Sequence, residues 1–178
     1  MQPLTTARLI VRSFRQADWP AVLSYTGNPA VMTYLPEGVF NGEAARAFVT
    51  QNEGESARAF GVELRQTGQL IGHISFHPWF GNQTYEIGWV FHPDFYGQGL
   101  ATEAANAMIQ FGFETLHLHR IIATCQPENP ASQRVMEKIG MRREGHFKQC
   151  IYRGNNVWWD EYFYAILAQE WAHLAQKS

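Results

Sequence analysis

Two closely spaced glycines precede a long helix in the stretch EIGWVFHPDFYGQGLATEA. Proline lacks an N–H and restricts the residue before it, so we expect a strand to leave its sheet near Pro93. Gly97 and Gly99 allow a tight turn, and the N–H groups of about Gly99 to Thr102 would have no acceptor within the helix. Such groups, with the helix dipole behind them, bind phosphate. The segment predicts a phosphate site, although a Gly-x-Gly pair alone is more often only a tight connection.

Two other phosphate-binding motifs do not fit this turn. A Walker loop ends in Gly-Lys-Ser or Gly-Lys-Thr, which is absent here. A dinucleotide fingerprint needs a small residue where Thr102 stands and a preceding βαβ unit, whereas the segments before this turn alternate as consecutive strands. Both interpretations are therefore excluded.

The elements that position the turn follow from hydrophobic periodicity and capping residues. Leu9, Val11 and Phe14 alternate with arginines, which predicts a first strand with one face toward a core. Asp18, Asn28 and Asn41 each precede a helical pattern, and each can cap it. We then expect strands at Ala59 to Arg65, Leu70 to His77, Tyr85 to Phe91, Arg120 to Cys125, Arg142 to Tyr152 and Val157 to Leu167, with helices at Leu100 to Leu116 and Pro130 to Ile139.

Composition limits the function classes. The chain has 178 residues without repeats or linkers, which predicts one domain. Its 14 Lys and Arg against 16 Asp and Glu give a net charge of -2, so nucleic acid is not expected as the main partner. We expect Cys125 and Cys150 to be buried free thiols, as in a reducing cytoplasm. No signal peptide and no run of about 18 apolar residues is visible, so export and a membrane are not expected.

The histidines do not suggest a metal site. His73 and His77 share a strand face, but four residues at about 3.3 Å each separate them by about 13 Å, too far for one ion. We therefore expect no metal.

The order and spacing of five segments resemble the GNAT superfamily of acetyl-CoA-dependent N-acetyltransferases, and more narrowly its RimJ/RimL-like branch of ribosomal-protein N-terminal acetyltransferases. The segments are TARLIVRSFRQAD, GQLIGHISF, YEIGWVFHPDFYGQGLATEA, ENPASQRVMEKIGM and the closing DEYFYAILAQEW. The resemblance implies one GNAT domain over residues 1–178. It implies an α+β (mixed α/β) fold with a central mixed, mostly antiparallel sheet of about seven strands and helices on both faces, splayed between the fourth and fifth strands.

The resemblance also implies how acetyl-CoA would be held. The backbone N–H groups of the turn and the first helical residues would bind its pyrophosphate, and backbone near Val90 and Phe91 would pair with the pantetheine arm. Asn129 caps the helix that begins at Pro130, and the resemblance adds a contact to the cofactor arm. The proposed pyrophosphate ligands are Gln98, Gly99, Leu100, Ala101 and Thr102.

The resemblance suggests one catalytic role, and the chemistry of the reaction suggests a second. Many relatives protonate the departing thiolate with a tyrosine, but Met136 stands at that position. Ser132 becomes the candidate donor, or gives only a hydrogen bond to sulfur. A neutral amine must attack the thioester, so a base or a water chain must take a proton. Glu86, expected on a largely covered strand face where burial would raise its pKa, is the candidate base, with a structural carboxylate as the alternative.

The acceptor is the open question. We expect a protein or peptide α-amine, attacked by direct transfer in a ternary complex. The alternatives are a polyamine or aminoglycoside acceptor, and a non-catalytic acyl-CoA-binding module, which the missing tyrosine keeps open. The chain would work as a monomer or homodimer.

Overall fold

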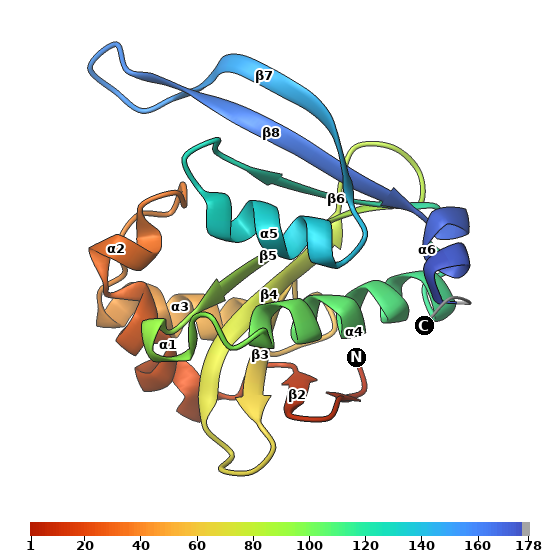
Figure 1. Ribbon diagram of the computed structural model, residues 1–178. Coiled ribbons are helices and arrows are strands. Elements are labelled where there is room, and N and C mark those ends of the chain that lie inside the picture. Colours follow the sequence, from red (N-terminus) through yellow and green to blue (C-terminus); the bar gives the residue numbers. More distant parts are fainter. Residues whose placement is uncertain (176–178) are drawn as a thin grey trace. The chain divides into compact units, whose positions relative to one another are not determined.

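The computed structural model describes residues 1–175 (Figure 1). Hydrogen bonding orders the eight strands β1-β2-β3-β4-β5-β6-β8-β7. The β5–β6 pair is parallel, whereas β1–β2, β2–β3, β3–β4, β6–β8 and β7–β8 are antiparallel. This is the expected mixed, mostly antiparallel sheet. The strands are β1 (Leu4–Thr5), β2 (Leu9–Arg12), β3 (Ala59–Leu64), β4 (Leu70–Pro78), β5 (Thr84–Phe91), β6 (Arg120–Cys125), β7 (Arg142–Tyr152) and β8 (Trp158–Leu167).

Six α-helices and two 3-10 turns lie between and after these strands in the described residues. No helix within residues 1–175 is long and apolar enough to cross a membrane. The helices are α1 (Trp19–Thr26), α2 (Pro29–Met32), α3 (Gly42–Gln51), α4 (Leu100–Glu114), α5 (Pro130–Lys138) and α6 (Ala168–Ala175), and the 3-10 turns are η1 (Gln16–Asp18) and η2 (Pro93–Phe95).

The chain forms two compact units. The first contains Met1–His77 and Gly88–Met108, and the second contains Pro78–Ile87 and the chain from Ile109 onward. In the first unit, apolar side chains from α1 and α3 pack with strand residues in one cluster. That cluster includes Val22, Tyr25, Ala45, Val49, Leu70 and Val90, all buried. These contacts fix β3, β4 and the end of β5, from which the glycine turn departs.

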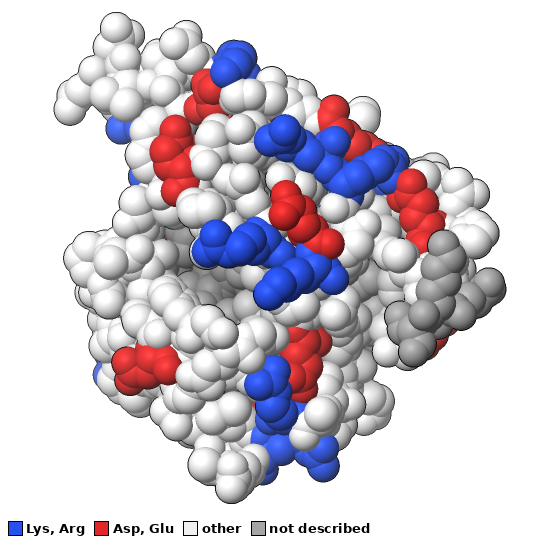
Figure 2. Space-filling view, in the orientation of Figure 1, with Lys and Arg blue, Asp and Glu red and all other residues white. Residues whose placement is uncertain are grey.

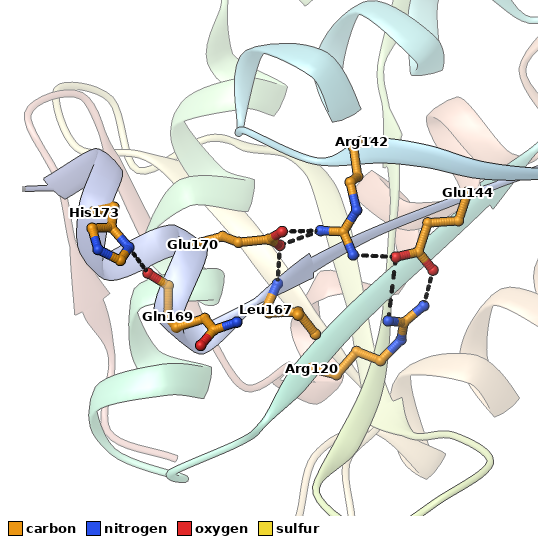
Figure 3. Close-up of polar contacts among 7 residues, drawn as sticks. All are labelled: Arg120, Arg142, Glu144, Leu167, Gln169, Glu170 and His173. Atoms are coloured by element: carbon orange, nitrogen blue, oxygen red, sulfur yellow. Dashed lines mark hydrogen bonds and ion pairs between the residues drawn. The ribbon is translucent and has the colours of Figure 1, made fainter.

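In the second unit, β6 lies between β5 and β8, and β7 extends the sheet at its edge. A charge network joins β6, β7 and α6: Arg142 pairs with both Glu144 and Glu170, and Arg120 pairs with Glu144 (Figure 3). Glu170 also accepts the Leu167 N–H at 2.9 Å. That backbone hydrogen bond and the Arg142 guanidinium hold the pKa of Glu170 below its usual value. The network therefore ties the start of α6 to the sheet.

Most predicted boundaries agree with the structure to within two residues, and Asn28 and Asn41 cap α2 and α3 as expected. Asp18 was wrongly expected to cap α1. Its carboxylate instead accepts the Arg15 N–H at 2.8 Å and pairs with Arg12 at 2.8 Å. Arg12, expected on the solvent face, is buried because Asp18 and Glu63 both neutralise it.

Four further expectations differ from the structure. Cys150 is exposed, not buried, because it lies in β7, the edge strand of the sheet, where almost every residue on both faces is accessible to solvent. The helix after Asn28, expected over NPAVMTYL, is shorter, because α2 spans only Pro29–Met32. Neither β1 nor α6 was expected.

On the face drawn in Figure 2, positive and negative side chains lie beside one another.

Candidate active site

The turn between η2 and α4 is an open backbone cradle. Gly97 and Gly99 have φ of 74° and 76°, which a residue with a Cβ adopts only with strain. A Cβ on Gly97 would meet nothing within 4 Å. The Glu103 N–H donates to the Gly99 carbonyl at 3.0 Å, so the N–H groups of residues 100–102 precede the first helical hydrogen bond. These residues can hold an anion such as a pyrophosphate.

Local hydrogen bonds shape this turn. The His92 ring accepts the Asp94 N–H at 3.3 Å, and the Tyr96 N–H donates to the Pro93 carbonyl at 3.0 Å. The Gln98 side chain donates to the Asp94 carbonyl at 3.1 Å. The Gln98 side chain is thus engaged within the turn, whereas its backbone N–H makes no hydrogen bond within residues 1–175.

A clamp that the sequence did not predict holds the first turn of α4. Glu103 accepts the Thr6 hydroxyl at 2.6 Å and the Arg8 backbone N–H at 2.8 Å. The Arg8 Nε donates to Glu103 at 2.6 Å, and its Nη1 donates to the Gln98 carbonyl at 3.0 Å. Partial burial raises the pKa of Glu103, but the hydrogen bonds from Thr6 and Arg8 outweigh it and lower that pKa overall. Arg8 is one of the arginines that alternate with Leu9 and Val11, and that pattern indicated only the polar face of a strand.

At the end of β5, one backbone N–H group points away from β4. The His92 N–H donates to the Ile71 carbonyl of β4 at 2.8 Å, and the Val90 carbonyl lies 2.5 Å from where a Cβ on Gly72 would stand. Because backbone groups alternate sides along a strand, the N–H of Phe91 points away from β4. Val90 itself is part of the core cluster of the first unit. Phe91 is the better placed of the two residues for a ligand.

Glu86 lies in the part of β5 that pairs with β6, opposite Ile122. It is half-buried, less covered than expected. The Thr124 hydroxyl donates to its Oε1 at 3.5 Å. Thr124 is paired in turn with Phe163 of β8. Glu86, Ile122, Thr124 and Phe163 therefore share one face of the sheet in the second unit.

That face continues into four aromatic residues, which we call the aromatic cluster. Trp79 lies 5.3 Å from Phe163 and 5.9 Å from Phe80, measured between ring centroids, and Phe147 lies 5.7 Å from Phe163. Phe163 is buried, whereas Phe80 is 84% exposed and Phe147 is 49% exposed. The cluster presents apolar surface to solvent, and Glu161 of β8 is a second carboxylate on this face.

The start of α5 carries Asn129 and Ser132. The Asn129 side chain accepts the Ser132 N–H at 3.1 Å, which confirms Asn129 as the cap of this helix. No hydrogen bond to the Ser132 hydroxyl occurs within the described residues, and this side chain is half-buried. Met136, one turn further, is buried. The serine hydroxyl is thus available as a donor, and the methionine is part of the core.

The buried titratable groups near the core have structural roles. Burial raises the pKa of the Cys125 thiol to about 12, so it is not a nucleophile at neutral pH. Burial lowers the pKa of His73 to about 3, and its Nδ1 lies 2.9 Å from the Tyr25 hydroxyl. Among residues 1–175, no three His, Cys, Asp or Glu side chains are grouped so that they could hold a metal ion.

The acidic pair of the hairpin, Asp160 and Glu161, is partly used within β7 and β8. Asp160 accepts the Gln149 N–H at 2.8 Å, and it also pairs with Lys148 at 3.1 Å and His146 at 2.7 Å. These hydrogen bonds, the Gln149 N–H first, lower the pKa of Asp160 to about 2. Asp160 therefore stabilises the irregular hairpin.

Comparison with known proteins identifies the class. Residues 8–142 match the family model described as "Acetyltransferase (GNAT) domain". The uncharacterized N-acetyltransferase YnaD of Bacillus subtilis (strain 168) is 58% identical over 168 residues, which cover 94% of this chain and 98% of that protein. The crystal structure of a GNAT-family acetyltransferase from Bacillus anthracis superimposes with a TM-score of 0.90 at 55% identity, covering 94% of this chain and 99% of that one. A more distant relative, the [ribosomal protein uS5]-alanine N-acetyltransferase of Escherichia coli (strain K12), is 29% identical over 85 residues, 48% of this chain and 43% of its own length.

The family model covers well over half of the sequence, and the strand order and helices agree with the fold of this class. The chain belongs to the GNAT family of N-acetyltransferases. Its reaction is the transfer of an acetyl group from acetyl-CoA to an amine. The resemblance seen in the sequence is thereby confirmed at the level of the family, and the RimJ/RimL-like branch stays a prediction.

Proposed function

We propose that this enzyme acetylates the α-amine of a protein or peptide whose N-terminal residues are apolar. The proposal is supported chiefly by the face that bears Glu86, which continues into the aromatic cluster. Aromatic surface favours an apolar neighbour of the reacting amine. Asp160, which could have attracted a polycation, is engaged within the hairpin. The name of the distant Escherichia coli relative, an acetyltransferase acting on an alanine of a ribosomal protein, is consistent with this acceptor.

The chemistry of amines supports the same choice. Reference pKa values are about 7.8 for an α-amine and about 10.4 for lysine, so about 14% of α-amines but only about 0.04% of lysine amines are neutral at pH 7. A site whose candidate base is one carboxylate has limited means to deprotonate lysine. Because more of the α-amine is already neutral, its acetylation depends less on deprotonation by Glu86 than acetylation of a lysine amine does.

The proposed reaction is a direct transfer. The neutral amine attacks the thioester carbonyl carbon, a C–N bond forms, and the C–S bond breaks. Glu86, directly or through water, takes the amine proton. The N–H of Phe91 stabilises the oxyanion, and the Ser132 hydroxyl donates a hydrogen bond or a proton to the departing thiolate. The N–H groups of Gln98 to Thr102 bind the pyrophosphate, and Asn129 contacts the pantetheine arm.

The acceptor is tested with two peptides of matched sequence. One has a free N-terminus and a blocked lysine, and the other has the reverse. Initial rates at pH 7 with acetyl-CoA should be higher for the free N-terminus. Faster transfer to the lysine peptide, or transfer only to spermidine or an aminoglycoside, would overturn the acceptor proposal and leave the acetyltransferase class intact. Absence of thiol release with every amine tested would support the binding-module alternative.

The contribution of the aromatic cluster is tested separately. Phe147→Ser should raise the KM for a peptide beginning with apolar residues, because about half of this side chain is exposed and available to an acceptor. Its affinity for acetyl-CoA should stay unchanged. Tyr152→Ser, which removes an aromatic residue that is 59% exposed at the far end of β7, is the matched control. Equal KM values for the two variants and the wild type would exclude the cluster as an acceptor surface.

A further inference from the structure

Arg8 stands beside the phosphate cradle with one nitrogen unused. Its Nε is engaged by Glu103 and its Nη1 by the Gln98 carbonyl. Its Nη2 makes no hydrogen bond within the described residues, and it lies 3.7 Å from where a Cβ on Gly99 would stand. The side chain is 49% exposed, so a ligand can reach it. A guanidinium donor thus adjoins the backbone N–H groups of the turn.

The negative charge of Glu103 affects how well the turn before α4 can bind an anion. A carboxylate in the first turn of a helix favours the helix itself, but it repels an anion bound at the same end. Glu103 is 19% exposed, so solvent screens its charge only in part. Its ion pair with Arg8 at 2.6 Å offsets that repulsion. Without Arg8 the cradle would carry an uncompensated negative charge.

We propose that Arg8 binds the pyrophosphate of acetyl-CoA through Nη2 while its Nε and Nη1 hold Glu103 and the Gln98 carbonyl in place. This inference rests on the proposed placement of the pyrophosphate at Gln98 to Thr102. It gives Arg8 two tasks, a direct ligand contact and the positioning of the turn. The planar fork of arginine suits both, because its N–H groups point in fixed, different directions.

The first test is Arg8→Gln, measured by calorimetry with acetyl-CoA. We expect affinity to fall about 10-fold, since a partly exposed, charge-assisted contact is lost. Arg65→Gln is the matched control. Arg65 is another exposed arginine that holds the same N-terminal segment, by donating to the Thr6 carbonyl at 2.7 Å, and it should bind acetyl-CoA as the wild type does. Thermal unfolding without ligand establishes that both variants are folded.

The double variant Arg8→Gln with Glu103→Gln separates a direct contact from simple charge compensation. If Arg8 only neutralised Glu103, removing both charges would restore wild-type affinity, which would overturn the inference. If Arg8 contacts the phosphate, the double variant stays weak. Dephospho-CoA, which keeps the pyrophosphate and lacks the 3′-phosphate, should show the same loss with Arg8→Gln. Equal binding of dephospho-CoA by variant and wild type would overturn the assignment to the pyrophosphate.

A third variant distinguishes an error in the Arg8 inference from an error in the proposed pyrophosphate site. Gly99→Asp places a carboxylate in the turn itself. If Gly99→Asp weakens acetyl-CoA and Arg8→Gln does not, the Arg8 inference is wrong and the cradle stands. If Gly99→Asp binds acetyl-CoA normally, the pyrophosphate lies elsewhere, and both the proposed pyrophosphate site and the Arg8 inference are wrong.

Discussion

Gly99→Asp is the most direct perturbation of the proposed cofactor site. Gly99 has φ of 76°, and apart from the adjacent residues the only group within 4 Å of a Cβ built on it is the Arg8 guanidinium. An L-residue in this backbone region costs about 1–2 kcal/mol, which lowers stability without preventing folding. The new carboxylate would lie where the phosphate is expected to bind.

The magnitude follows from Coulomb's law. Two like charges about 5 Å apart at an effective dielectric constant of about 20 repel by about 3 kcal/mol. Gly99 is exposed, so screening reduces this figure, and at about 1.4 kcal/mol per factor of ten we expect a 10- to 100-fold loss of acetyl-CoA affinity.

Calorimetry of the folded variant measures this loss. Gly68→Asp is the matched control, because Gly68 has φ of 70° in the β3–β4 turn with nothing within 4 Å of a Cβ. It carries the same strain and charge away from the cradle, and it should bind acetyl-CoA normally. A folded Gly99→Asp protein with wild-type affinity, or an equal loss in both variants, would refute the phosphate site.

Three further predictions concern catalysis and stability. Glu86→Gln should lower the rate at pH 7 by about 10- to 1,000-fold and recover toward pH 9, where more amine is already neutral; parallel pH profiles would remove Glu86 from the mechanism. Ser132→Ala should lower kcat with acetyl-CoA affinity and helix capping intact, because the cap uses the Ser132 N–H and not its hydroxyl; full turnover would exclude the serine. His73, with a pKa lowered by burial to about 3, stays neutral when folded but binds a proton when unfolded below pH 6.5, so stability should fall by about 2 kcal/mol between pH 8 and pH 5. His73→Gln should remove most of that pH dependence in chemical denaturation, and an unchanged slope would contradict the assignment.

The parts of the fold that agree with the sequence are those with local signals. Strand β6 and helix α5 begin at the expected residues because an unbroken apolar run and an Asn-Pro cap define them. The glycine turn was predictable because positive φ angles require residues such as Gly97 and Gly99. Helix α6 was missed because no capping residue precedes Ala168 and no glycine or proline separates the helix from β8. Its start is fixed by Glu170, whose partner Arg142 lies 28 residues away.

The candidate site likewise has one part that the sequence predicts and one part that it does not. Its backbone part, the N–H groups before the first α4 hydrogen bond, follows from the sequence around Gly99 alone. Its side-chain part, the Arg8–Glu103 pair, joins residues 95 positions apart and leaves no periodic signal in either segment. Arg8 alternates with Leu9 like any residue on the solvent face of a strand, and Glu103 resembles an ordinary acidic residue at a helix start. Only the fold shows that the acidic residue, unfavourable for an anion by itself, is neutralised by an arginine whose remaining donor adjoins the cradle. A carboxylate in the first turn of such a helix is therefore compatible with phosphate binding when a distant cation compensates it.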